Sequence, residues 1–244
     1  MKKVLITREE KQARKTAQLL EKEGFKPILF PTIRFEKVSF DKKDLVKADI
    51  VIFSSQNAVE FLLSEIDINH LKGKTIIATG EKTEKALKKK GIKNVIIPEI
   101  YSAEGVANLI KSKKEFKGKK AVAVRPVEGL NTLIDELESY LEIKPLPVYK
   151  TVPNTPENKD QIKKELEKGQ IYAVIFTSPS TFENFIRIFP DSWKDLLKKT
   201  KTAVIGTTTA QALLKMGINP DVIPQKFTLD HLIKNLKQLN YPDC

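Results

Sequence analysis

Short runs of consecutive apolar residues alternate along this chain with stretches in which apolar residues recur every three or four positions. The strand-like runs lie at 4–7, 27–31 and 50–53. In the stretch after the first run, Ala13, Ala17 and Leu20 are spaced to share one face of a helix. Gly24 is expected to end that helix. An unbroken apolar run is typical of a strand covered on both faces, and the wider period is typical of an amphipathic helix. The alternation therefore predicts βαβ units with parallel sheets, an α/β fold.

The two halves of the chain repeat each other in order. The matched segments are 2–8 with 119–125, 51–55 with 174–178, and 80–83 with 206–209. A repeat of about half of the 244 residues is too long for a solenoid and indicates two related α/β domains. We therefore expect two similar parallel-sheet domains with a ligand cleft between them, beyond the carboxyl ends of the strands.

Hydroxyl side chains follow the predicted strands at equivalent places in the two halves. Ser55 and Ser178 come directly after apolar runs, and the segments Gly80–Thr83 and Gly206–Thr209 form a second equivalent pair. Each place precedes a predicted helix, where free backbone N–H groups and hydroxyls suit carboxylates. Helix capping by the same residue types is the alternative for each single hydroxyl. Their recurrence predicts an anion-binding cleft.

The charge balance also points to an anionic ligand. The chain has 43 Lys and Arg against 31 Asp and Glu, a net charge of +12, and a pI near 9.5. Such a surface attracts nucleic acid, anionic lipid or a small substrate with several carboxylates or phosphates, unless lysine here is simply the solubilising residue. Aromatic residues do not interleave with the basic runs, and no apolar run is long enough for a membrane span. We therefore expect neither nucleic acid nor a membrane as partner.

The sequence lacks the motifs of several common kinds of enzyme. There is no P-loop, no dinucleotide fingerprint and no G-x-S-x-G elbow. The one cysteine is Cys244, which excludes a disulfide framework, a zinc cluster and an internal cysteine nucleophile, and His70 and His231 are too scattered for a metal site. Residues 1–8 contain no signal-peptide core, so we expect a cytoplasmic protein. An enzyme of this composition would act by positioning and hydrogen bonding, without a metal.

Six segments together resemble the uroporphyrinogen-III synthase family. They lie in the expected order across nearly the whole chain, at 4–8, 50–59, 80–83, 146–151, 174–180 and 205–213. The resemblance implies two α/β domains joined by a two-stranded linker, with residues 1–34 and 152–244 in one domain and 36–148 in the other. The internal repeat alone fits two contiguous halves equally well.

The resemblance also implies a reaction. Members of this family cyclise hydroxymethylbilane to uroporphyrinogen III in tetrapyrrole (haem and porphyrin) biosynthesis, with loss of water, inversion of ring D and no cofactor. Such a lyase would take a small polycarboxylate tetrapyrrole as its partner, which fits the positive net charge. We expect a monomer. Two alternatives stay open: a non-catalytic two-domain protein that binds a small anionic ligand, and a protein that senses a tetrapyrrole or nucleotide.

Particular residues match the family's functional positions. Tyr149 matches the tyrosine of a Val-Tyr-x-Thr segment, and the resemblance implies that it protonates the leaving hydroxyl; a phenol with a pKa near 10 is protonated at neutral pH. The alternative is a tyrosine that merely packs at a strand end. The implied substrate-binding residues are Ser55, Thr83, Ser178, Thr208, Thr209 and Arg8. Arg8 and Arg125 each end the first strand of a repeat, where a carboxylate or a surface salt bridge can meet them. Pro126 removes a backbone donor from the second of these turns.

Overall fold

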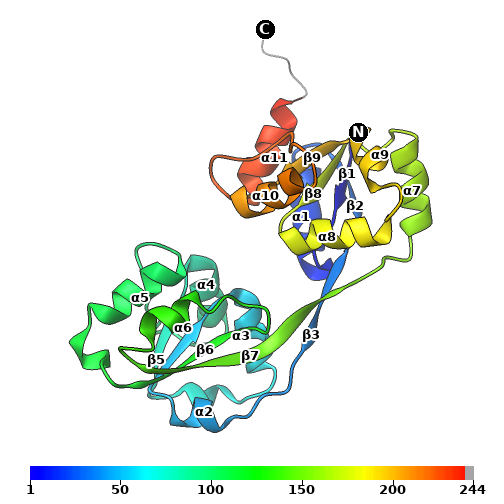
Figure 1. The fold of residues 1–244 in the computed structure, drawn as a ribbon. Coiled ribbons are helices and arrows are strands. Elements are labelled where there is room, and N and C mark those ends of the chain that lie inside the picture. Colours follow the sequence, from blue (N-terminus) through cyan, green and yellow to red (C-terminus); the bar gives the residue numbers. More distant parts are fainter. Residues whose placement is uncertain (240–244) are drawn as a thin grey trace. The chain divides into compact units, whose positions relative to one another are not determined.

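The computed structural model describes residues 1–239, so Cys244 lies outside the described residues. The chain forms two compact units: unit 1 comprises Met1–Arg34 and the chain from Val152 onward, and unit 2 comprises Phe35–Thr151 (Figure 1). Both boundaries fall within strands, at one end in β3 (Ile33–Lys37) and at the other in β7 (Glu142–Pro153). These two strands are neighbours in one sheet.

Unit 1 contains a four-stranded sheet in which every pairing is parallel. The strand order is β2 (Lys26–Leu29), β1 (Lys3–Ile6), β8 (Ala173–Phe176), β9 (Lys201–Val204). Every residue of β8 is buried, as expected for an apolar strand covered on both faces. The strand expected over 27–31 is β2, which ends at Leu29, because Pro31 has no amide N–H with which to continue the ladder.

Helices cover both faces of the unit 1 sheet because its strands point alternate apolar side chains to opposite faces. Val4 and Ile6 pack with α1 (Glu10–Lys22) and α11 (Leu229–Gln238) on one face. Leu5 and Val174 belong to the core on the other face. That core is completed by α7 (Lys159–Glu167), α8 (Pro179–Ile188), α9 (Trp193–Lys198) and α10 (Thr207–Lys215).

Unit 2 repeats this plan around a five-stranded sheet. Its order is β3, β7, β6 (Lys120–Pro126), β4 (Ile50–Phe53), β5 (Thr75–Ala78), with parallel pairing from β7 through β5. One face packs against α2 (Lys43–Lys47), α3 (Gln56–Leu63) and α4 (Glu81–Lys89), and the other against α5 (Ala103–Lys111), α6 (Thr132–Leu137) and the short η2 (Lys114–Phe116). The short η1 (Ile68–Leu71) connects α3 to β5. The fold class is α/β with parallel-dominated sheets, as the sequence pattern predicts.

One strand pair in unit 2 departs from regular pairing. Between β6 and β7, Arg125 pairs with Pro147, but the next residue, Pro126, pairs with Tyr149. Val148 is passed over, and both Val148 and Tyr149 pack in the core on the α3 side of the sheet. Consecutive residues of a regular strand point to opposite faces. The register shift therefore places Tyr149 on the α3 side.

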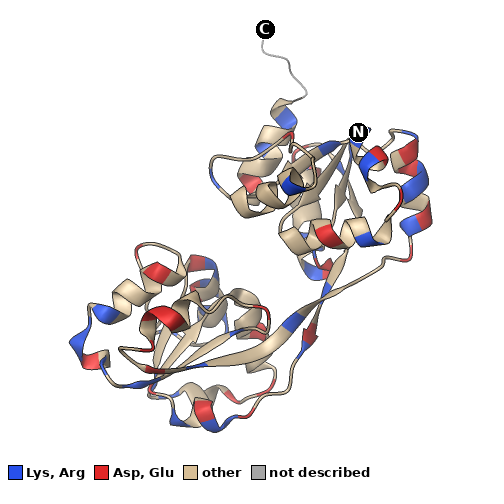
Figure 2. Cartoon of the chain, in the orientation of Figure 1, with Lys and Arg blue, Asp and Glu red and all other residues tan. Residues whose placement is uncertain are grey.

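Charged side chains are spread over both units, with Lys and Arg lying among Asp and Glu (Figure 2). Lys85 pairs with Glu81, one turn away on α4, at 3.4 Å, and Lys111 of α5 pairs with Glu136 of α6 at 2.8 Å. Exposed pairs of this kind contribute at most about 1 kcal/mol each. Within residues 1–239, no helix is long and apolar enough to cross a membrane.

Candidate functional site

Four strands end at the places where the sequence predicts hydroxyl-bearing turns. Ser55 caps α3 directly after β4, and Ser178 caps α8 directly after β8. Gly80 and Gly206 stand at the equivalent N-cap positions of α4 and α10. The predicted strand-to-helix turns are therefore confirmed, and all four lie at carboxyl ends of strands.

A cavity of about 420 Å³ lies in unit 2 at these strand ends. Ser54 and Ser55 enter it from the end of β4, Thr79 from the end of β5, and Arg125 from the end of β6. Tyr149 of β7 completes the polar lining together with side chains at the start of α5. Of the sequence-predicted residues, the cavity brings Tyr149 and Ser55 together.

The Tyr149 side chain is fixed by aromatic packing and by hydrogen bonds to Ser55 and Asn57. Its ring stacks on Phe61 with centroids 5.0 Å apart and meets Phe35 edge-on at 5.4 Å. Its hydroxyl lies 3.3 Å from Ser55 Oγ, which accepts the amide N–H of Ala58 at 3.1 Å. Because that oxygen already accepts a hydrogen bond, the Ser55 proton is available to the Tyr149 oxygen. The phenol proton is then available for donation into the cavity.

The protonation state of Tyr149 follows from its burial. Burial raises the pKa of the Tyr149 phenol above its usual value of 10.0, and the nearby charge of Glu128 adds to the increase. Hydrogen bonds from the side chains of Ser55 and Asn57 oppose the shift without reversing it. The phenol therefore stays protonated through the neutral range, so this group can donate a proton but cannot act there as a base.

Arg125, Ser54 and Tyr101 line the cavity although they are not in the sequence-predicted set of site residues. Arg125 Nη1 donates to the carbonyl oxygen of Leu130 at 2.8 Å, whereas Arg125 Nε and Ser54 Oγ are buried and have no hydrogen-bond partner among the described residues. Tyr101 forms part of the wall and is 54% exposed. The sequence places Arg125 at a strand end and Ser54 beside Ser55 after an apolar run, whereas Tyr101 carries no sequence signal that separates it from ordinary turn residues.

Thr83 and Thr209 occupy the same place in the two units. They are 4% and 2% exposed, and no hydrogen bond is formed by either hydroxyl within the described part of the chain. The N-caps of their helices are Gly80 and Gly206, so helix capping, the alternative for these threonines, is not found. Thr83 does not line the 420 Å³ cavity.

The remaining candidates lie in unit 1. Ser178 accepts the amide N–H of Thr181 at 3.3 Å and forms a capping box with that residue. Its hydroxyl also lies 2.9 Å from that of Ser180. Thr208 is exposed and lines a groove of about 490 Å³ between α8 and α10. Capping is therefore a real role of Ser178, and contact with a ligand remains a prediction for both residues.

Arg8 does not behave like its counterpart in the repeat. Its Nη1 donates to Thr16 Oγ1 at 3.2 Å and its Nη2 to Gln12 Oε1 at 2.9 Å, so the guanidinium lies against α1. Burial lowers the pKa of this guanidinium, with a smaller opposing effect of the Glu9 charge. Helix α1 covers the sheet face opposite to α8 and α10. The Arg8 guanidinium therefore lies on the α1 side of the sheet, and its contact with a ligand stays a prediction.

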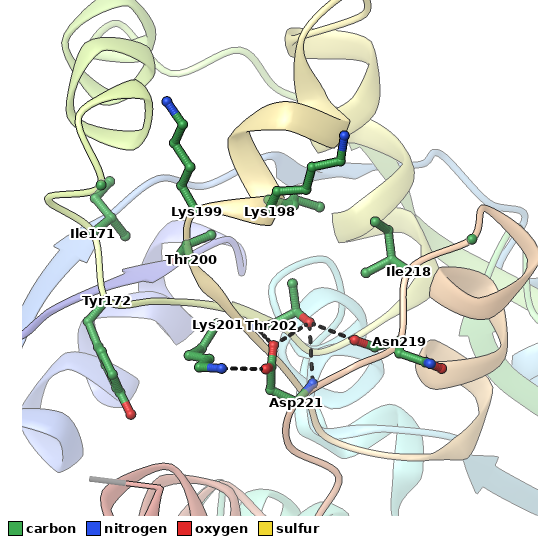
Figure 3. Close-up of a pocket in the computed structure, with 13 residues that line it drawn as sticks. Ile171, Tyr172, Lys198, Lys199, Thr200, Lys201, Thr202, Ile218, Asn219 and Asp221 are labelled. Atoms are coloured by element: carbon green, nitrogen blue, oxygen red, sulfur yellow. Dashed lines mark hydrogen bonds and ion pairs between the residues drawn. The ribbon is translucent and has the colours of Figure 1, made fainter.

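Another cavity, of about 480 Å³, lies in unit 1 at the opposite ends of the strands (Figure 3). Its lysines are already engaged. Lys201 pairs with Asp221 at 2.9 Å, and Lys199 donates to the carbonyl oxygen of Glu167 at 2.7 Å. The amide N–H of Thr202 also donates to the Asp221 carboxylate, at 2.8 Å. Because these lysines are already bonded to protein oxygens and the cavity lies at the amino ends of β8 and β9, it is not the candidate site.

The fold and the site together define a class: α/β proteins of two similar units that offer hydroxyls, an arginine and a protonated phenol at strand ends. The sequence model described as uroporphyrinogen-III synthase HemD matches residues 14–234. The uroporphyrinogen-III synthase of Chlorobaculum parvum is 33% identical over 235 residues, covering 93% of this chain and 94% of that protein. The chain therefore belongs to the uroporphyrinogen-III synthase family.

Solved structures share the fold. The uroporphyrinogen-III synthetase of Helicobacter pylori matches with a TM-score of 0.71 at 22% identity, over 98% of this chain and 100% of that one. A mutant uroporphyrinogen III synthase from Thermus thermophilus matches with a TM-score of 0.62 at 21% identity, over 98% of both chains. Family membership makes this protein an enzyme of haem biosynthesis and favours the synthase over a non-catalytic binding protein.

Proposed function

We propose that this enzyme cyclises hydroxymethylbilane to uroporphyrinogen III as a lyase that releases water, inverts ring D and uses no cofactor. The observation that carries the proposal is the protonated Tyr149 phenol, held 3.3 Å from Ser55 in a cavity that also contains Arg125. The substrate is a small polycarboxylate tetrapyrrole, which the net charge of +12 attracts. We take the enzyme to be a cytoplasmic monomer without nucleic-acid or membrane partners.

In the proposed mechanism, Tyr149 supplies the proton that lets the hydroxyl leave. The phenol donates to the terminal hydroxymethyl oxygen, the C–O bond breaks, and water departs from an azafulvene cation. The substituted carbon of ring D attacks this cation, and the resulting spiro intermediate fragments and recloses with the ring inverted. The last proton lost from the new ring returns to the Tyr149 oxygen, which restores the acid. A positioned acid of this kind contributes about 10²–10⁴-fold to the rate.

The other predicted residues enter the proposal as substrate contacts. They are Ser55, Thr83, Ser178, Thr208, Thr209 and Arg8. Thr83 and Thr209 are buried in the first turns of equivalent helices at strand ends, and this shared position supports the role.

Isomer analysis of the product tests the proposal. Hydroxymethylbilane, generated enzymatically, is supplied to the protein, and the porphyrin isomers are separated after oxidation. Without catalysis the bilane closes to isomer I, so a reaction without protein is the matched control. We expect isomer III from the protein, and a product that contains isomer I alone would refute the proposal.

A further inference from the structure

The cavity in unit 2 contains a cation without a counter-ion. No carboxylate of the described residues forms an ion pair with Arg125, and Leu130 supplies the single hydrogen-bond acceptor to its guanidinium. The equivalent arginine of unit 1, Arg8, also has a buried Nε without a partner, but its two terminal nitrogens donate to side-chain oxygens. A partly buried guanidinium without an anion is energetically unfavourable, and a carboxylate is its best geometric match. The position of Arg125 therefore predicts an anionic ligand group in this cavity.

The orphaned hydroxyl of Ser54 points to the same ligand group. Its Oγ is buried without a partner, although both main-chain groups of Ser54 are engaged: its amide donates to Val124 at 3.0 Å, and its carbonyl accepts from Thr79 at 3.0 Å. Buried hydroxyls in native proteins nearly always have a partner. Ser54 and Arg125 line one cavity, so one carboxylate can satisfy both.

The rest of the cavity wall suits a flat, weakly polar ring. The lining residues beside the polar ones are largely apolar and include Leu133 and Ile134 of α6. The Tyr101 ring is held against Gly80, where an added Cβ would lie 3.1 Å from its Cγ, and its hydroxyl donates to Glu81 at 3.1 Å. A volume of about 420 Å³ lies within the range of small-molecule sites, about 300–1,000 Å³.

We propose that this cavity binds one carboxylate-bearing pyrrole ring of the substrate, with the carboxylate on Arg125 and Ser54 and the ring packed against Tyr101. The inference rests on the proposed function, because it takes the substrate to be a linear tetrapyrrole. It assigns Arg125 and Ser54 a binding role and leaves the chemistry to Tyr149. Ground-state binding of this kind changes KM far more than kcat.

Two substitutions test the carboxylate contact by steady-state kinetics with hydroxymethylbilane. Arg125→Gln removes the charge, and we expect KM to rise about tenfold or more while kcat stays within about twofold, because charge-assisted hydrogen bonds are about twice as strong as neutral ones. Arg14→Gln is the matched control, since it removes the same charge from an exposed ion pair on α1. Its KM should equal that of the wild type.

Salt dependence separates charge recognition from support of the loop at Leu130. Loss of an electrostatic contact makes KM less sensitive to added salt, whereas a merely distorted loop leaves that sensitivity unchanged. Ser54→Ala adds a second test that does not touch this loop. It removes an unsatisfied buried hydroxyl, so its melting temperature should equal or exceed that of the wild type while its KM rises.

The outcomes are distinguishable. An unchanged KM in Arg125→Gln, or a raised KM with wild-type salt sensitivity, overturns the assignment of this cavity. If wild-type protein yields isomer III in those same experiments, the proposed function stands and only the carboxylate contact is rejected. If wild-type protein yields isomer I alone, the proposed function itself fails.

Discussion

Replacing Tyr149 with phenylalanine separates catalysis from stability unusually well. The substitution removes one hydroxyl whose hydrogen bond to Ser55 is 3.3 Å long, while the ring keeps its packing on Phe61 and Phe35. Ser55 still accepts the Ala58 amide, so the cap of α3 survives. A neutral hydrogen bond contributes about 0.5–1.5 kcal/mol net, and one this long falls toward the lower end. We therefore expect the melting temperature to fall by at most about 2–4 °C.

The effect on turnover should be far larger. Loss of a general acid lowers kcat by about 10²–10⁴-fold, which exceeds anything that a hydrogen bond of this length contributes to stability. The assay is the isomer-resolved conversion of hydroxymethylbilane, run beside thermal melts of the same preparations. Tyr140→Phe is the control, since it also removes a phenol hydroxyl with a 3.3 Å hydrogen bond, here to the carbonyl oxygen of Lys113 on the other side of the sheet. Wild-type turnover in Tyr149→Phe would remove this residue from the mechanism.

Three further expectations follow from the same site. The raised pKa of Tyr149 means that the rate should not fall between neutral pH and about pH 10 through loss of this acid, but should fall above it; a decline centred near pH 8 would contradict a phenolic acid. Thr209→Ala should raise KM or lower kcat with its helix intact, since Gly206 is the N-cap; a change in melting temperature alone would make Thr209 a packing residue. Added salt should raise the wild-type KM, because screening shortens the reach of exposed charges to about 8 Å at physiological ionic strength, and a salt-independent KM would count against carboxylate attraction.

The fold was predictable because it depends on local patterns that the sequence displays directly. The apolar residues 50–53 form β4, buried on both faces, and Ser55 begins the helix that follows. Ser178 does the same in the other unit. Strand burial and helix capping are properties of a few consecutive residues, so they can be inferred without knowing what lies across the fold.

The site was less predictable because it depends on neighbours that are distant in sequence. Arg8 and Arg125 have equivalent positions in the repeat, yet Gln12 and Thr16 draw Arg8 onto α1, whereas Arg125 lines a cavity. The partners of Arg8 are near it in sequence, whereas the cavity around Arg125 is built from distant segments that include Ser54 and Tyr101. Tyr101 joins the same cavity only because its ring fits against Gly80 across a turn.

The position of the Tyr149 phenol depends on the register shift between β6 and β7. Tyr149 reaches the α3 side because Val148 is skipped in the pairing that joins Arg125 and Pro126 to β7. With Val148 kept in the chain, a regular ladder would turn the phenol toward the α5 side, without altering a single residue around Ser55. Moving the Val148–Tyr149 pair to another scaffold would therefore require copying the irregular ladder itself, since an ideal sheet would point these two consecutive side chains into opposite layers.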